Sequence, residues 1–130
     1  MAAPTKTVLI VEDEKPLLNA IKMKLESYGF DVVTTRTMDQ ALQYMQDIPN
    51  IDIIWLDHYL LGKGTGLDFV VAVKSNPKWK KIPIFVVSNT ASPDKVRSYI
   101  KFGVSKYYTK ADFRLDQIIA DMKETLEADK

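Results

Sequence analysis

Five side chains that could do chemistry come directly after apolar segments of the chain. Three carry carboxylates, one carries a hydroxyl and one carries an amine: Glu12, Asp13, Asp57, Ser88 and Lys110. Three carboxylates held together repel one another, and one of them would take a proton unless positive charge is supplied. Mg²⁺ is a hard cation that binds oxygen ligands and keeps several waters. The residues therefore predict a site in which Mg²⁺ and Lys110 balance three negative charges.

Asp57 is the residue of this set that could accept a phosphoryl group. It directly follows the apolar run 53–56, where a buried strand would end. A phosphoryl group on its carboxylate would bring new anionic oxygens into the site. The metal, the Lys110 amine and the Ser88 hydroxyl would stabilise this charge.

The segments that must position these residues alternate between two patterns. Short runs rich in β-branched and apolar residues predict strands at 7–11, 31–35, 51–56, 84–87 and 105–109. Apolar residues recur at helical spacing within 17–25, 41–48, 67–73, 96–100 and 115–126. Gly29, Pro49 and Gly103 close three of the predicted helices, and Asp112 is the expected N-cap of the last one.

Five strand–helix repeats predict an α/β fold with a doubly wound parallel sheet of five strands and five helices. In such sheets, ligands bind outside the carboxyl ends of the strands. The residues after the first, third, fourth and fifth runs are therefore expected at one edge of the sheet: Glu12-Asp13, Asp57, Ser88-Asn89-Thr90 and Lys110. The 130 residues show no repeat or linker, so a single domain is expected.

Composition excludes several classes of function. The chain is 46% hydrophobic and 27% charged, which is the balance of a globular domain. Its net charge of +1 argues against nucleic acid or a membrane surface as a partner. The absence of cysteine excludes disulfides and thiolate metal sites. No signal-peptide layout and no apolar run of ~20 residues is present, so a cytoplasmic location is expected.

Together, these segments resemble the receiver domain of two-component response regulators. The matching motifs are Val11-Glu12-Asp13-Glu14, Leu56-Asp57-His58-Tyr59-Leu60, Val87-Ser88 and Gly103-Val104-Ser105-Lys106-Tyr107-Tyr108-Thr109-Lys110. Each motif alone is a weak signal, but their order and spacing over residues 5–128 make the combined signal strong. The resemblance implies a flavodoxin-like sheet with strand order 2-1-3-4-5 and a single receiver domain over residues 1–130.

The resemblance also implies a role for each site residue. Asp57 would attack phosphorus, and Lys110 would pair with the phosphoryl oxygens. The ligands of Mg²⁺ would be Glu12, Asp13, Asp57 and the backbone carbonyl of Tyr59. Ser88 and Tyr107 would form the switch that responds to phosphorylation.

The implied phosphoryl donor is a phosphohistidine on a histidine kinase or on a histidine phosphotransfer protein. The chain would not be an enzyme in the usual sense, because it would catalyse only its own phosphorylation and dephosphorylation. Its output would pass through the fourth helix, the fifth strand and the fifth helix. A downstream protein target or a second copy of the chain could dock on that surface.

Three positions depart from the family pattern. Leu61 and Ala111 stand where proline is usual, and Asn89 stands where a small residue commonly follows the hydroxyl. Asn89 is therefore expected to crowd the phosphoryl site. The Lys110–Ala111 peptide is expected to be trans, because a cis bond before alanine costs about 3–4 kcal/mol.

Several single residues have a structural interpretation that competes with a functional one. His58 is expected to be a loop residue rather than a catalytic partner of Asp57, because adjacent residues on an extended chain point to opposite faces. The glycines of segment 62–66 lack the spacing and the lysine of a phosphate-binding loop, so they are expected to form turns. One of Tyr107 and Tyr108 is expected to be an ordinary strand aromatic.

Three other functions are possible on such a fold. A flavin-binding electron carrier needs a phosphate-cradling loop after the first strand, where Glu12-Asp13-Glu14 would repel the phosphate. A phosphatase of the haloacid dehalogenase type needs a second acid two residues after its aspartate nucleophile, where this chain has Tyr59. A degenerate receiver that only binds partners stays open, since Leu61, Asn89 and Ala111 are unusual.

Overall fold

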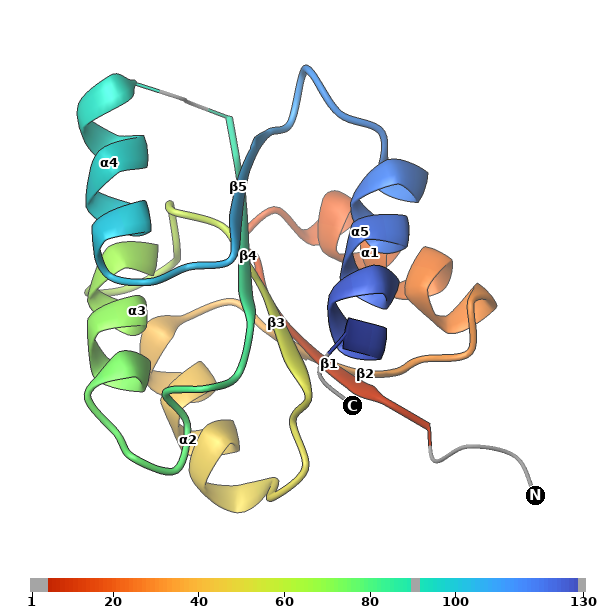
Figure 1. Cartoon of the computed structure of the whole chain (residues 1–130), viewed down its shortest axis with the longest axis horizontal. Helices are drawn as coiled ribbons and strands as arrows, with labels where there is room; N and C mark the ends of the chain where they lie inside the picture. The colour runs from red at the N-terminus through yellow and green to blue at the C-terminus, as the bar shows by residue number, and fades with distance from the viewer. Residues whose placement is uncertain (1–4, 90–91, 129–130) are drawn as a thin grey trace.

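The structure contains a parallel sheet of five strands (Figure 1). The computed structural model describes residues 5–89 and 92–128. Within them the strands are β1 Thr7–Val11, β2 Asp31–Thr35, β3 Ile53–Leu56, β4 Ile84–Ser88 and β5 Lys106–Thr109. They follow the order β2-β1-β3-β4-β5, and each neighbouring pair is parallel. The predicted fold class and strand order are therefore confirmed.

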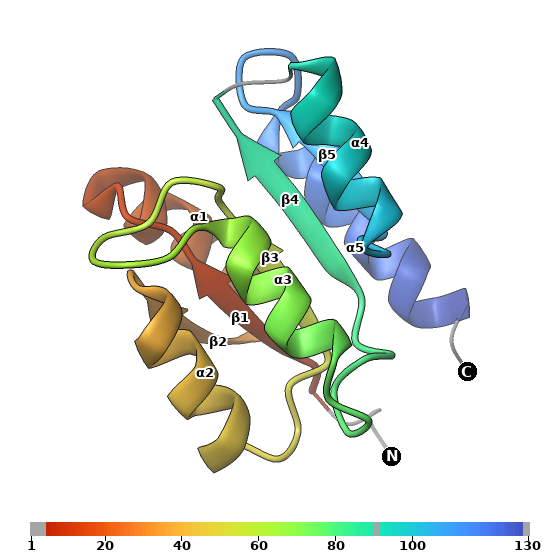
Figure 2. The same cartoon turned by 90° about the vertical axis from the view of Figure 1, so that its left-hand side faces the viewer.

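Helices cover both faces of the sheet. They are α1 Lys15–Ser27, α2 Met38–Asp47, α3 Gly66–Lys74, α4 Pro93–Lys101 and α5 Leu115–Ala128. The helices α1 and α5 lie on one face, and α2, α3 and α4 lie on the other (Figures 1 and 2). Within the described parts of the chain, none of these helices has both the length and the apolar character that crossing a bilayer requires.

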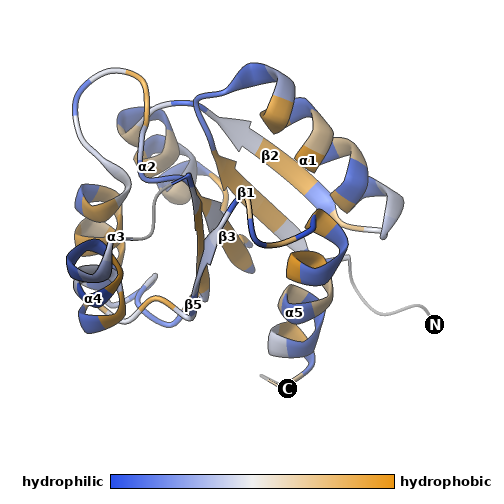
Figure 3. Ribbon diagram, turned by 90° about the horizontal axis from the view of Figure 1, so that it is seen from above, coloured by the Kyte–Doolittle hydropathy of each residue, from blue (hydrophilic) through white to orange (hydrophobic). Residues whose placement is uncertain are grey.

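The central strands are buried on both faces, as parallel strands between two helical layers must be. All residues of Ile53–Leu56 and of Ile84–Ser88 are buried. Because successive side chains point to opposite faces, Trp55 packs against α1 and α5, whereas Leu56 packs against α2, α3 and α4. Figure 3 shows apolar residues along the strands and polar residues on the outer sides of the helices.

The ends of two helices follow the sequence prediction, but the start of the last helix does not. Gly29 and Gly103 follow α1 and α4 with φ values of 91° and 92°, a region that favours glycine. Asp112 is not the N-cap of α5, because that helix begins at Leu115. The Asp112 amide instead donates a hydrogen bond to the Thr109 carbonyl at 3.0 Å, which closes a turn after β5.

Candidate functional site

The carboxyl ends of four strands bring the predicted site residues to one edge of the sheet. The strands β1 and β3 end in the same register, so Glu12 and Asp57 leave the sheet side by side. The Asp57 amide donates a hydrogen bond to the Val11 carbonyl at 2.9 Å. The strand β4 ends at Ser88, and the Lys110 amide donates to the Ser88 carbonyl at 2.8 Å. The backbone of the sheet therefore fixes where these side chains begin. Thr90, which was expected beside them, lies outside the described residues.

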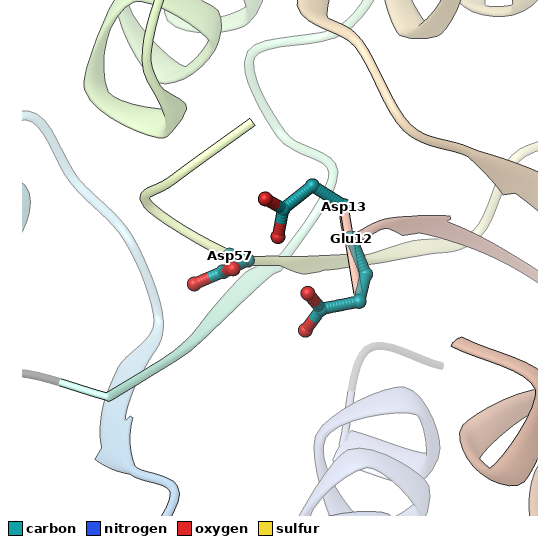
Figure 4. A group of neighbouring side chains, drawn as sticks. All are labelled: Glu12, Asp13 and Asp57. Atoms are coloured by element: carbon teal, nitrogen blue, oxygen red, sulfur yellow. The ribbon is translucent and has the colours of Figure 1, made fainter. Parts of the chain in front are cut away.

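Three carboxylates converge at this edge (Figure 4). One oxygen from each of Glu12, Asp13 and Asp57 lies within 4.8 Å of the other two. Glu12 and Asp57 are buried, whereas Asp13 is half-buried and keeps the cluster open to solvent. Carboxylate oxygens gathered so closely, with access to water, form the kind of site that Mg²⁺ prefers.

Lys110 supplies positive charge to the two buried carboxylates. Its Nζ lies 2.9 Å from Glu12 Oε1 and 3.5 Å from Asp57 Oδ2. Burial lowers the pKa of Lys110, but the hydrogen bond to Glu12 and the charge of Asp57 outweigh it, so that the pKa lies above its ordinary value. Lys110 is therefore charged at neutral pH and is held between both acids.

One lysine does not compensate the burial of these acids. Burial raises the pKa of Glu12 from 4.5 to about 7, with Asp57 adding to the rise and Lys110 opposing it. Burial likewise raises the pKa of Asp57, against the charge of Lys110. Protons are therefore bound more tightly here than at ordinary carboxylates. A divalent cation would compete with those protons for the same oxygens.

Two buried polar atoms of the site have neither a hydrogen-bond partner nor an ion-pair partner among the described residues. They are Asp57 Oδ1 and Ser88 Oγ. Such atoms cost about 1–3 kcal/mol each when they are left unpaired. A carboxylate oxygen can take a cation or a phosphorus atom, and a hydroxyl can donate to an anionic oxygen. The donor atoms present at this edge therefore fit Mg²⁺ and a phosphoryl group.

Arg36 positions Asp13 and was not anticipated. Its Nε and Nη2 donate hydrogen bonds to the Asp13 carbonyl at 3.1 and 2.8 Å. The contact holds the turn after β1 and leaves the Asp13 carboxylate free to face the cluster. Arg36 directly follows β2, so asking which residue follows the second predicted strand would have found it.

The two tyrosines of β5 lie on opposite faces of the sheet. Tyr108 is buried, donates a hydrogen bond to Asp121 at 2.5 Å and packs against Phe85. Tyr107 is half-buried on the other face, with its ring centroid 5.6 Å from that of Tyr99. Tyr108 thus belongs to the core, and Tyr107 is the aromatic that faces α4.

His58 lies in the loop after β3, as expected, but its side chain makes a specific contact. Its Nδ1 lies 2.6 Å from the hydroxyl oxygen of Tyr99, a buried residue of α4. Burial and the nearby charge of Lys95 lower the pKa of His58, which favours the neutral imidazole. The next residue, Tyr59, also contacts α4, because the Lys95 amine donates to its hydroxyl at 3.0 Å.

The three unusual positions have structural outcomes. The Leu61 amide donates to the Arg36 carbonyl at 3.0 Å, so the loop without proline is tied to the chain after β2. The side chain of Asn89 is exposed. No cis peptide occurs among the described residues, and the Lys110–Ala111 bond is trans as predicted. Gly62 and Gly64 have positive φ values, which suits turn glycines.

Comparisons with known proteins match most of the chain to one family. Residues 8–123 match the model of the family described as the response regulator receiver domain. Over 119 residues the chain is 31% identical to the phosphate regulon transcriptional regulatory protein PhoB of Klebsiella pneumoniae. That match covers 91% of this chain and 50% of PhoB, so the chain spans about half the length of that relative. Over 103 residues it is 26% identical to the two-component response regulator ORR8 of Oryza sativa subsp. indica, covering 79% of this chain and 84% of that one.

Solved structures show the same fold. The phosphorylated cyanobacterial phytochrome response regulator RcpA superposes with a TM-score of 0.80 at 28% identity, covering 95% of this chain and 93% of RcpA. The chemotaxis protein CheY4 of Vibrio cholerae superposes with a TM-score of 0.84 at 24% identity, covering 93% of this chain and 98% of CheY4. At that lower identity the second likeness concerns the fold alone.

Proposed function

The chain belongs to the response regulator receiver domain family of two-component signal transduction, and we propose that it works by accepting a phosphoryl group on Asp57. The observation that carries this proposal is the buried Asp57 carboxylate, which has one oxygen near Lys110 and the other without a hydrogen-bond partner among the described residues. Such an oxygen is available to attack an electrophile, because none of the described residues donates a hydrogen bond to it.

Each neighbouring residue has a proposed part in the transfer. The Asp57 oxygen forms a bond to phosphorus while the bond from phosphorus to the donor nitrogen breaks. Lys110 pairs with the phosphoryl oxygens, and the Ser88 hydroxyl donates to one of them. Mg²⁺ would be held by Glu12, Asp13, Asp57 and the Tyr59 carbonyl, and it would supply positive charge to the same oxygens.

The proposed donor is a phosphohistidine on a histidine kinase or on a phosphotransfer protein. Residues 1–130 would form one receiver domain that catalyses only its own phosphorylation and dephosphorylation. Phosphorylation would alter the surface of α4, β5 and α5, where a downstream protein or a second copy would bind. The proposal is supported by the family match and by the position of Tyr107 next to α4.

The test is phosphorylation by a small-molecule donor. Wild-type protein, Asp57→Asn and the control Asp31→Asn are incubated with acetyl phosphate and Mg²⁺, and the mass of each intact protein is measured. Asp31 is an exposed aspartate at the start of β2, at the opposite edge of the sheet. We expect one phosphoryl group on wild type and on Asp31→Asn, and none on Asp57→Asn. Equal labelling of Asp57→Asn would show that another residue is the acceptor.

A further inference from the structure

The segment that follows β3 is attached to α4 by two consecutive side chains. His58 reaches Tyr99, and Tyr59 reaches Lys95, whose Nζ also lies 4.7 Å from the centroid of the Tyr59 ring. The contact of His58 is the more buried of the two, because Tyr99 is 0% exposed whereas Tyr59 is 49% exposed. The phosphoacceptor segment and α4 are thus joined across 41 residues of sequence by a partly buried hydrogen bond.

Tyr99 occupies this position because the start of α3 leaves room for it. A Cβ atom on Gly66 would lie 2.7 Å from the Tyr99 hydroxyl oxygen and 2.5 Å from the Asp57 carbonyl oxygen. The Gly66 amide donates to the His58 carbonyl at 2.8 Å. Gly66 therefore lies against both the Tyr99 hydroxyl and the backbone of Asp57 and His58, with no side chain of its own between them.

The backbone of residues 57–59 carries three parts of the proposed site. Asp57 provides the acceptor carboxylate, and the amide of His58 is one of the groups that lower the pKa of that carboxylate against its burial. Tyr59 provides the carbonyl proposed to bind the metal. A shift of this short segment would therefore change metal binding and phosphoryl transfer together.

We infer that His58 and Tyr99 are positioning residues for phosphoryl transfer, whose hydrogen bond holds the backbone of residues 57–59 against α4. The inference rests on the proposed function of Asp57. It adds a connection from the site to α4 that does not pass through Ser88. Because coupling between two sites is reciprocal, whatever moves α4 changes metal affinity at the site, and metal or phosphoryl binding changes α4. The Tyr99 ring also contacts Tyr107, so the connection continues to β5.

The chain offers a matched pair of single-atom deletions for the test. Tyr99→Phe removes the hydroxyl that reaches His58. Tyr108→Phe removes another tyrosine hydroxyl from a buried ring, which bonds Asp121 on the opposite face of the sheet. Each variant is titrated with Mg²⁺ while amide signals of residues 57–59 and α4 are followed by nuclear magnetic resonance, and its rate of labelling by acetyl phosphate is measured.

We expect Tyr99→Phe to bind Mg²⁺ at least about fivefold more weakly and to be labelled more slowly. The α4 signals should respond less to Mg²⁺ than those of wild type, whereas Tyr108→Phe should behave like wild type. If wild type and Tyr99→Phe have the same Mg²⁺ affinity and labelling rate, the inference is wrong and the proposed function stands. If wild type itself does not respond to Mg²⁺, the proposed metal site fails and the inference fails with it.

Substitutions of His58 separate positioning from general packing. His58→Asn has a polar side-chain atom at the same number of bonds from the backbone as Nδ1 of His58. This variant should therefore keep most of the wild-type Mg²⁺ affinity. His58→Leu should lose that affinity and should also be less stable than Tyr99→Phe, because it buries the Tyr99 hydroxyl without a partner. Adding Tyr99→Phe to His58→Leu should recover stability but not Mg²⁺ affinity. Equal Mg²⁺ affinities of His58→Asn and His58→Leu would contradict a positioning role.

Discussion

Glu12 lies buried beside Asp57 and shares Lys110 with it. Burial raises its pKa from 4.5 to about 7, so the folded protein holds this proton at pH values where the unfolded chain has lost it. The resulting stabilisation is fully present below pH 4.5 and is lost as the pH rises through 7. Without metal, the free energy of unfolding should fall by roughly 1–3 kcal/mol over this range.

The pH dependence can be measured by urea unfolding between pH 4.5 and 8 without metal. Glu12→Gln cannot titrate, so its stability should vary less with pH than that of wild type. Glu127→Gln, at an exposed position of α5, is the control and should follow wild type. A pH profile of Glu12→Gln as steep as that of wild type would assign the effect to another group.

Asp13 is the carboxylate of the cluster that is open to solvent, so it should decide whether Mg²⁺ binds. Binding to the folded state alone raises stability in proportion to the logarithm of ligand concentration over dissociation constant. We expect millimolar Mg²⁺ to raise the melting temperature of wild type and to leave that of Asp13→Ala unchanged. Without metal, Asp13→Ala should melt at or above the wild-type temperature, because it removes like charge. A wild-type melting temperature that ignores Mg²⁺ would count against the site.

Strand order alone predicted which of the site side chains lie together. Residues after the ends of parallel strands gather at one edge, and Glu12, Asp57 and Lys110 do lie together there. The contact between His58 and Tyr99 could not be predicted in this way. Tyr99 is one of the apolar positions of a helix, and its partner depends on how α4 packs beside the loop after β3. Sequence periodicity gives the face of a helix but not its neighbour.

The first turn of helix α3 lies against the backbone of the phosphoacceptor Asp57. It starts with a capping box, in which the Thr65 hydroxyl accepts from the Asp68 amide and the Asp68 carboxylate accepts from the Thr65 amide. This fixes Gly66 at the first position of the helix, against the Asp57 carbonyl. The cap thus places a residue without a side chain where the backbone comes closest.

Gly66→Ala should therefore disturb the site as well as the fold. Its new methyl group would lie 2.5 Å from the Asp57 carbonyl oxygen, and relieving this overlap should cost about 1–3 kcal/mol of stability. Gly29→Ala is the matched control, because its cost of about 1–2 kcal/mol comes from its φ of +91°, with no atom within 4 Å. Both variants should melt earlier in thermal unfolding, but only Gly66→Ala should lose Mg²⁺ affinity. Equal Mg²⁺ affinity in the two variants would show that the site adapts to the methyl group.

Element types were predictable because buried parallel strands and amphipathic helices have different periods. Element boundaries were less so. β3 begins at Ile53 rather than at residue 51, because the Asp52 carboxylate accepts a hydrogen bond from the Thr7 amide at 2.8 Å. Asp112 has the right chemistry for a helix cap, but the turn after β5 uses its amide first. Both boundaries depend on partners that are distant or irregular in the sequence.

The sheet separates two layers of helices, one on each of its faces. The layer of α1 and α5 packs on the core that contains Trp55 and Tyr108, whereas α2, α3 and α4 pack on the face that contains Leu56 and Tyr107. The phosphoacceptor segment contacts α4, a helix of the second layer, through the side chains of His58 and Tyr59. A change at Asp57 should therefore reach α4 and β5 before it reaches α1.

The switch expected of Ser88 and Tyr107 can be tested on this scale with beryllofluoride as a mimic of the phosphoryl group. The Ser88 hydroxyl is buried without a partner among the described residues, so an anionic oxygen on Asp57 would draw it inward. Tyr107, half-buried against Tyr99, could then turn further in, and burying the rest of its ring would contribute on the order of 1 kcal/mol. A contribution of this size shifts a state populated at ten per cent to about forty per cent, roughly a fivefold change in the equilibrium.

Beryllofluoride with Mg²⁺ should therefore move amide signals of α4 and β5 and alter the Tyr107 ring signals, while signals at the far ends of α1 and α2 stay in place. Ser88→Ala should still bind the mimic but show a smaller change in the Tyr107 signals than wild type. If Tyr107 responds normally in Ser88→Ala and fails to respond in Tyr99→Phe, the signal reaches β5 through α4 rather than through the hydroxyl.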